Sequence, residues 1–121
     1  MAIQAGIIGY GLSGSVFHAP ILRSVPDYEV HTIVSSDPDK VHKDLPDTAV
    51  VDSVDELLSN PDIDVVIITS PNATHYEYTR LAIEAGKHVV VEKPFTVTSA
   101  EADQLIDLAK QKRVLLTVYH N

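Results

Sequence analysis

The sequence contains no cysteine, so the chain can form neither a disulfide bond nor a thiolate metal site. Its histidines have no ligand spacing, and we expect no metal site. No apolar run approaches the roughly 18 residues that a membrane-spanning helix requires. Lys and Arg number only 9 against 17 Asp and Glu, and no basic run could follow a phosphate backbone. Neither a membrane nor a nucleic acid is therefore an expected partner.

The N-terminus, MAIQAGIIGYG, lacks the basic region and the small-residue cleavage site of a secretory signal peptide. This absence predicts a cytoplasmic location. The 121 residues are 45% hydrophobic, with a mean hydropathy of +0.05 and a net charge of −8. A chain of this size buries one core, so we predict a single domain over residues 1–121.

Short apolar runs alternate regularly with amphipathic segments along the whole chain. The runs span residues 3–9, 28–35, 49–51, 65–68, 88–91 and 115–118. Most are rich in Val and Ile, and several are apolar on both faces, which is typical of parallel strands covered by helices on both sides. The alternation therefore predicts an α/β fold, a doubly wound parallel sheet of about six strands.

Helix signals fill the segments between these runs. The sequences SVDE and TSAE are capping boxes, with Ser53 and Thr98 as the capping residues. Gly86 is a natural helix stop. In the last helix, helical spacing places four apolar residues on one face: Ala102, Leu105, Ile106 and Ala109.

A glycine motif, GYGLSG, follows the first predicted strand and precedes a segment that can be helical. This context favours the G-x-G-x-x-G turn of dinucleotide-binding proteins over a plain tight loop. In that turn, backbone amides at the start of the helix bind a pyrophosphate. The expected contacts are Gly9, Tyr10, Gly11, Leu12, Ser13 and Gly14.

The end of the second strand bears on the choice between NADP and NAD. NAD binders usually carry Asp or Glu there for the ribose 2′-hydroxyl, whereas a positive or neutral site suits the 2′-phosphate of NADP. Ser35 and Ser36 stand at this place, and Lys40 and Lys43 follow shortly after. NADP is favoured, but NAD stays open if Asp37 turns inward.

Three further segments end predicted strands at the same edge of the sheet: TSPNATH (69–75), VEKPF (91–95) and VYHN (118–121). With GYGLSG and the AGKHVVVEKP block, they resemble the N-terminal domain of the Gfo/Idh/MocA oxidoreductases over essentially the whole chain. FHAP, KPFTVT and VYHN are most similar to the branch of NADP-linked scyllo-inositol dehydrogenases. A dinucleotide-binding Rossmann domain is what this resemblance implies.

The resemblance also implies roles for residues at this edge. Lys93 of EKP would hydrogen-bond the substrate hydroxyl and help move its proton, with Glu92 fixing its geometry. Ser70, Pro71 and Asn72 would lie near the nicotinamide ribose, and Thr74 could cap the helix that follows. His75 would either contact the cofactor or hold the loop; the sequence leaves both roles open.

Members of the family continue into a second domain that holds the substrate and commonly the oligomer interface. The resemblance thus implies a homo-oligomeric full-length protein that acts on a sugar or polyol, and a separate 1–121 domain with little turnover. Hydride would pass between nicotinamide and a carbon bearing a hydroxyl. The alternative is a non-catalytic module that binds a dinucleotide and senses redox state.

Overall fold

The computed structural model describes residues 3–9, 28–69, 74–92 and 98–119. Its strands are β1 (Ile3–Ile8), β2 (Tyr28–Val34), β3 (Ala49–Val51), β4 (Val65–Ile68), β5 (His88–Glu92) and β6 (Leu116–Tyr119). Its helices are α2 (Pro38–Asp44), α3 (Val54–Leu58), α4 (His75–Glu84) and α5 (Ser99–Lys112). Each strand coincides with a Val- and Ile-rich run to within one residue at either end. No helix in the described ranges is long and apolar enough to cross a membrane.

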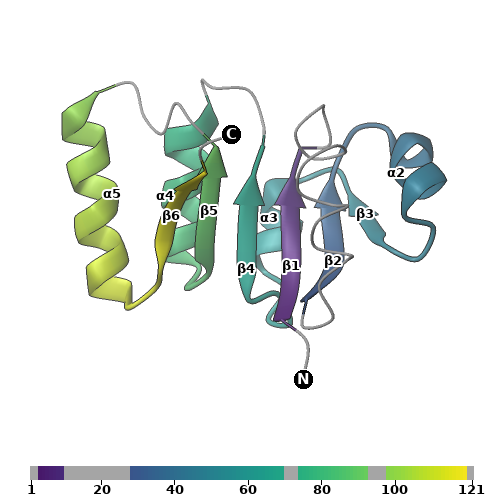
Figure 1. Cartoon of the computed structure of the whole chain (residues 1–121), viewed down its shortest axis with the longest axis horizontal. Helices are drawn as coiled ribbons and strands as arrows, with labels where there is room; N and C mark the ends of the chain where they lie inside the picture. The colour runs from purple at the N-terminus through teal and green to yellow at the C-terminus, as the bar shows by residue number, and fades with distance from the viewer. Residues whose placement is uncertain (1–2, 10–27, 70–73, 93–97, 120–121) are drawn as a thin grey trace.

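The strands form one six-stranded sheet in the order β3-β2-β1-β4-β5-β6, and every pair is parallel (Figure 1). The order runs outward from β1 in one direction to β3 and in the other, through β4, to β6. This reversal confirms the predicted doubly wound fold. In such sheets ligands bind outside the carboxyl ends of the strands, at the point of reversal. Here that point lies between β1 and β4.

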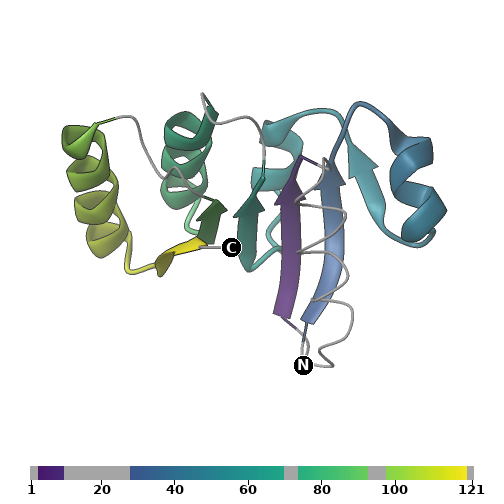
Figure 2. The same ribbon diagram turned by 45° about the horizontal axis from the view of Figure 1, so that its top comes forward.

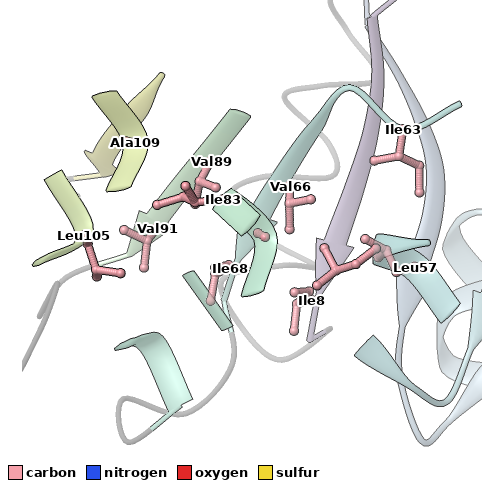
Figure 3. Close-up of a cluster of buried hydrophobic side chains, with 12 residues drawn as sticks. Ile8, Leu57, Ile63, Val66, Ile68, Ile83, Val89, Val91, Leu105 and Ala109 are labelled. Atoms are coloured by element: carbon pink, nitrogen blue, oxygen red, sulfur yellow. The ribbon is translucent and has the colours of Figure 1, made fainter. Parts of the chain in front are cut away.

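Helices cover the sheet on two faces. Ile8, Ile68 and Val91 point toward α3, α4 and α5, in the larger of two buried clusters (Figure 3). Ile7 and Ile33 point the other way and pack with residues of α2. Because successive side chains of a strand point to opposite faces, a strand buried on both sides must be apolar throughout. Figure 2 shows α4 and α5 side by side on one face and α2 at the opposite end of the sheet.

The apolar face of α5 is only partly buried. Leu105 and Ala109 are buried, but Ile106 is 42% exposed. Helix α5 packs on α4, and β6, beside which it lies, is the edge strand of the sheet. Within the described residues nothing beyond β6 covers the flank of α5 that carries Ile106.

The helix ends confirm two capping predictions and correct a third. Ser53 and Thr98 each accept the backbone N–H three residues ahead, at 3.2 Å. Thr74 occupies the N-cap of α4 but makes no side-chain capping bond. Its backbone is in the helical region, φ −97° and ψ −6°, whereas a capping side chain needs an extended backbone to reach the next turn. Asp37 caps α2, with Pro38 directly after it.

Candidate functional site

Gly9 links the carboxyl ends of three strands. It follows β1 with φ 94°, a backbone conformation that side chains disfavour, as the first glycine of the predicted turn requires. Its N–H donates to Val34 O of β2 at 3.0 Å. Thr69, directly after β4, donates its hydroxyl to Ile8 O and Gly9 O, each at 3.0 Å. Gly9 therefore lies at the point of reversal, where a ligand is expected.

Beside Gly9 lies a cavity of about 410 Å³ over the carboxyl ends of β1, β2 and β3. It is lined by Ile8, Gly9, Val34, Ser35, Ser36, Asp37, Lys40, Asp52, Val54 and Tyr78. The structure thus brings together Gly9, Ser35 and Ser36, three of the residues expected to hold a cofactor. Lys40 joins them, whereas Lys43 does not line the cavity.

One side of the cavity, formed by Ser35, Ser36 and Lys40, is rich in hydrogen-bond donors; we call it the cationic side. Ser35 is held in place by its backbone N–H, which donates to Val51 O at 3.0 Å. Its Oγ accepts the N–H of Asp37 at 3.1 Å, so its own hydrogen is left to donate outward. Hydroxyl and ammonium donors are the groups that bind a phosphate.

Asp37 lines the same cavity, yet it has a structural task. Its Oδ1 accepts the backbone N–H of Lys40 at 3.2 Å and caps α2. This bond directs one carboxylate oxygen to the helix backbone. Because Asp37 caps α2, it is a weaker candidate for the carboxylate that accepts a hydrogen bond from the ribose 2′-hydroxyl of NAD.

The cavity is also lined by Asp52, Val54 and Tyr78, of which Val54 and Tyr78 form what we call its apolar side. Val54 opens α3 and Tyr78 belongs to α4; both are half-buried and pack against the larger core cluster. Their positions are therefore fixed by the core. Asp52 is exposed and lies between the end of β3 and the N-cap of α3.

Sequence reasoning missed Asp52, Val54 and Tyr78 as residues of this cavity. Asp52 could have been found, because it follows a predicted strand at the same sheet edge as Ser35. Val54 and Tyr78 left no such signal, since apolar residues in helices usually fill a core. Their place in the cavity depends on how α3 and α4 pack.

His75 is the first residue of α4 and is only 1% exposed. It does not line the cavity beside Gly9. Glu92 ends β5, and its backbone pairs with Tyr119 of β6. The predicted contacts Tyr10, Gly11, Leu12, Ser13, Gly14, Ser70, Pro71, Asn72 and Lys93 lie outside the described residues.

The arrangement fits part of a dinucleotide. The cavity has the size of a small-molecule site, and its cationic side suits a phosphate on a ribose. Half-buried apolar side chains on the opposite side provide a surface for a flat base. Such a site binds and orients a ligand; among the residues that line it, none is placed as a nucleophile with an adjacent base.

Comparison with known proteins agrees with this geometry. Residues 3–120 match the oxidoreductase family with an NAD-binding Rossmann fold known as Gfo/Idh/MocA. The chain belongs to this family. It is 49% identical over 119 residues to the NADP⁺-linked scyllo-inositol 2-dehydrogenase IolW of Bacillus subtilis, covering 98% of this chain and 33% of that protein.

Two solved structures are similar to this chain over almost its whole length. That of yvaA from Bacillus subtilis has a TM-score of 0.97 and 48% identity, covering 99% of this chain and 36% of the other. That of KijD10, a 3-ketoreductase from Actinomadura kijaniata in complex with NADP and TDP-benzene, has a TM-score of 0.91 and 30% identity, covering 98% and 37%. The chain thus spans about a third of the length of these relatives.

Proposed function

We propose that this chain binds NADP(H) and forms the cofactor domain of an oxidoreductase acting on a hydroxyl-bearing carbon of a sugar or cyclitol. The observation that carries the proposal is the cavity beside Gly9, over the carboxyl ends of β1, β2 and β3. It is lined by Gly9, which has a positive φ, and by Ser35, Ser36 and Lys40. The named relatives IolW and KijD10, which are linked to or bound with NADP, support the same reading.

The preference for NADP rests on charge at the cationic side. A ribose 2′-phosphate would receive donors from Ser35 and Ser36 and an opposite charge from Lys40. A charge-assisted hydrogen bond of this kind contributes about 1.5–3 kcal/mol. The carboxylate of Asp37 would repel this phosphate. The repulsion is smallest while the carboxylate is held against the α2 backbone by its 3.2 Å capping bond.

The nicotinamide of a bound cofactor supplies or accepts the hydride. Lys93, directly after β5, would hydrogen-bond the substrate hydroxyl and carry its proton. Glu92, Ser70, Pro71, Asn72 and His75 would orient Lys93 and the nicotinamide ribose. The substrate pocket and a homo-oligomer interface would belong to a further domain of the longer protein.

Fluorescence titration of the chain with NADPH and with NADH tests the cofactor proposal. We expect NADPH to bind at least tenfold more tightly. Lys40→Gln should remove most of that preference by weakening NADPH alone, whereas Lys43→Gln, in the same helix but outside the cavity, should keep it. Binding of neither dinucleotide, or tighter binding of NADH, would overturn it.

The role of Lys93 is tested by Lys93→Met in the longer protein. A proton-carrying lysine predicts a loss of turnover of about 10²-fold or more, with NADPH affinity retained. A redox-sensing module predicts no turnover in the unchanged protein either. Turnover that survives the substitution would remove Lys93 from the reaction.

A further inference from the structure

Thr69 joins the carboxyl ends of β1 and β4 through both its backbone and its side chain. Its N–H donates to Ile8 O at 3.0 Å, which continues the β1–β4 pairing by one residue beyond Ile68. Its hydroxyl has one hydrogen, which is shared between Ile8 O and Gly9 O, each at 3.0 Å. The side chain of Thr69 therefore holds a carbonyl, that of Gly9, which lies outside the backbone ladder of the two strands.

The carbonyl of Gly9 needs such a bond because glycine lacks the side chain that restricts the backbone of other residues. The peptide group before Gly9 is fixed, since the N–H of Gly9 donates to Val34 O at 3.0 Å. Rotation about ψ of Gly9 would still turn its carbonyl, and with it the peptide group that follows. Within the described residues, the group that opposes this rotation is the hydroxyl of Thr69.

The peptide group that starts at Gly9 O leads into the glycine motif, whose amides are expected to bind the pyrophosphate. Because a peptide group is planar and trans, a fixed carbonyl oxygen also fixes the direction of the N–H in the same group. A donor that is already oriented loses less freedom when a ligand binds, so the affinity is higher. Thr69 does not line the cavity, whereas Gly9 does, and any effect of Thr69 there passes through Gly9.

We propose that Thr69 is a positioning residue for the cofactor: by holding Gly9 O, its hydroxyl keeps the first amide of the glycine motif oriented for the pyrophosphate of the bound dinucleotide. The inference rests on the proposed function, because it requires a dinucleotide beside Gly9. It extends that function by giving a role to a side chain at the end of β4, on the far side of the point of strand reversal. The role concerns the pyrophosphate, which NADP(H) and NAD(H) share, and is independent of the 2′-phosphate.

The test compares the unchanged chain with Thr69→Val and Thr69→Ser by fluorescence titration with NADPH and with NADH. Valine keeps the shape of threonine without its hydroxyl, so both cofactors should bind about threefold to tenfold more weakly, as expected for the loss of one hydrogen bond. Serine keeps the hydroxyl and should retain most of the affinity. Adenosine 2′-phosphate has no pyrophosphate, and in an NMR titration it should bind Thr69→Val as well as it binds the unchanged chain.

Thr48→Val is the matched control, because the hydroxyl of Thr48 also donates to a strand carbonyl, Val30 O at 3.2 Å, but outside the cavity. In urea unfolding it should lose stability as Thr69→Val does, yet it should keep its affinity for both cofactors. If valine at position 69 prevents folding, Thr69→Ala takes its place in the same comparison.

Three results would overturn the inference while leaving cofactor binding intact. They are full affinity in Thr69→Val, equal weakening in Thr69→Val and Thr48→Val, and a loss of affinity for adenosine 2′-phosphate as large as that for NADPH. Failure of Thr69→Ser to bind better than Thr69→Val would also overturn it. If neither NADPH nor NADH binds the unchanged chain, both proposals fail together.

Discussion

Gly6 of β1 lies directly against Leu57 of α3. A Cβ atom at position 6 would be 2.9 Å from Leu57 Cδ2 and 3.0 Å from Cδ1. Leu57 is fully buried in the core cluster that joins α3 to the sheet. The missing side chain at position 6 thus sets how closely α3 approaches β1, next to the strand end that carries Gly9.

Gly6→Ala should destabilise the fold by about 1–3 kcal/mol, because the added methyl overpacks a closed core. In Leu57→Val the side chain is shorter, so the double variant should lose less stability than the sum of the two single changes. Urea unfolding of the three variants measures this coupling. Strict additivity would show that the two side chains do not compete for space.

Thr79 of α4 is fully buried, and its Oγ1 has no hydrogen-bond partner in the described part of the chain. Thr79→Val keeps the shape and removes a buried polar group without a partner, so we expect it to stabilise the fold by about 1 kcal/mol. Thr79→Ser keeps the hydroxyl but leaves a small gap, and should destabilise. Loss of stability in Thr79→Val comparable to that in Thr79→Ser would indicate that the hydroxyl is bonded after all.

The sheet could be predicted almost to the residue because its strands are buried on both faces. Continuous runs such as Val65–Ile68 are hard to accommodate anywhere else. The helix caps at Ser53 and Thr98 could also be predicted, because capping depends on hydrogen bonds within four consecutive residues. Ser35 could be placed at the ligand-binding edge of the sheet because it directly follows a predicted strand.

Features that depend on packing between distant segments could not be predicted. Ile106 has the helical spacing of a core residue, but its exposure follows from β6 being an edge strand. The sequence around Tyr78 is that of an ordinary helix, and only the packing of α4 places Tyr78 in the lining of the cavity. A lysine just before a strand, such as Lys87, is ordinarily exposed to solvent, but Lys87 is only 7% exposed.

Lys87 is clamped between two backbone oxygens: its Nζ donates to Asn60 O and Ile63 O, both at 2.8 Å. Burial lowers the pKa of this ammonium below its ordinary 10.5, and the nearby carboxylates of Asp64 and Asp62 partly oppose that shift. The folded chain therefore releases this proton at a lower pH than the unfolded chain. Between the two pKa values the unfolded state binds more protons, so this group makes stability rise with pH.

Lys87→Met should be less stable than the unchanged chain at neutral pH, because two buried carbonyls lose their donor. The stability of Lys87→Met should also not rise with pH in the way that Lys87 causes in the unchanged chain. The difference in unfolding free energy between the two proteins, followed by urea unfolding from about pH 8 to pH 10.5, should widen as the pH increases. A constant difference over that range would contradict a lowered pKa at Lys87.

Gly9 has a strained backbone conformation and also lines the cavity. Its contribution to cofactor binding can be separated from the effect of backbone strain by comparison with Gly86. Gly9 and Gly86 both have positive φ, 94° and 80°, but only Gly9 lines the cavity. Alanine at either position should cost about 1–2 kcal/mol of stability, because its Cβ disfavours such a backbone. At position 86 a Cβ would meet nothing within 4 Å, so strain is the whole effect there.

Gly9→Ala should in addition weaken NADPH binding by at least tenfold, because the strand end that bonds to Val34 and Thr69 must shift. Gly86→Ala should retain the affinity, since it lies outside the cavity. Unfolding and NADPH titration of the two variants side by side make the comparison. Equal losses of affinity would assign the effect to general destabilisation, and unchanged affinity in Gly9→Ala would remove this glycine from the binding site.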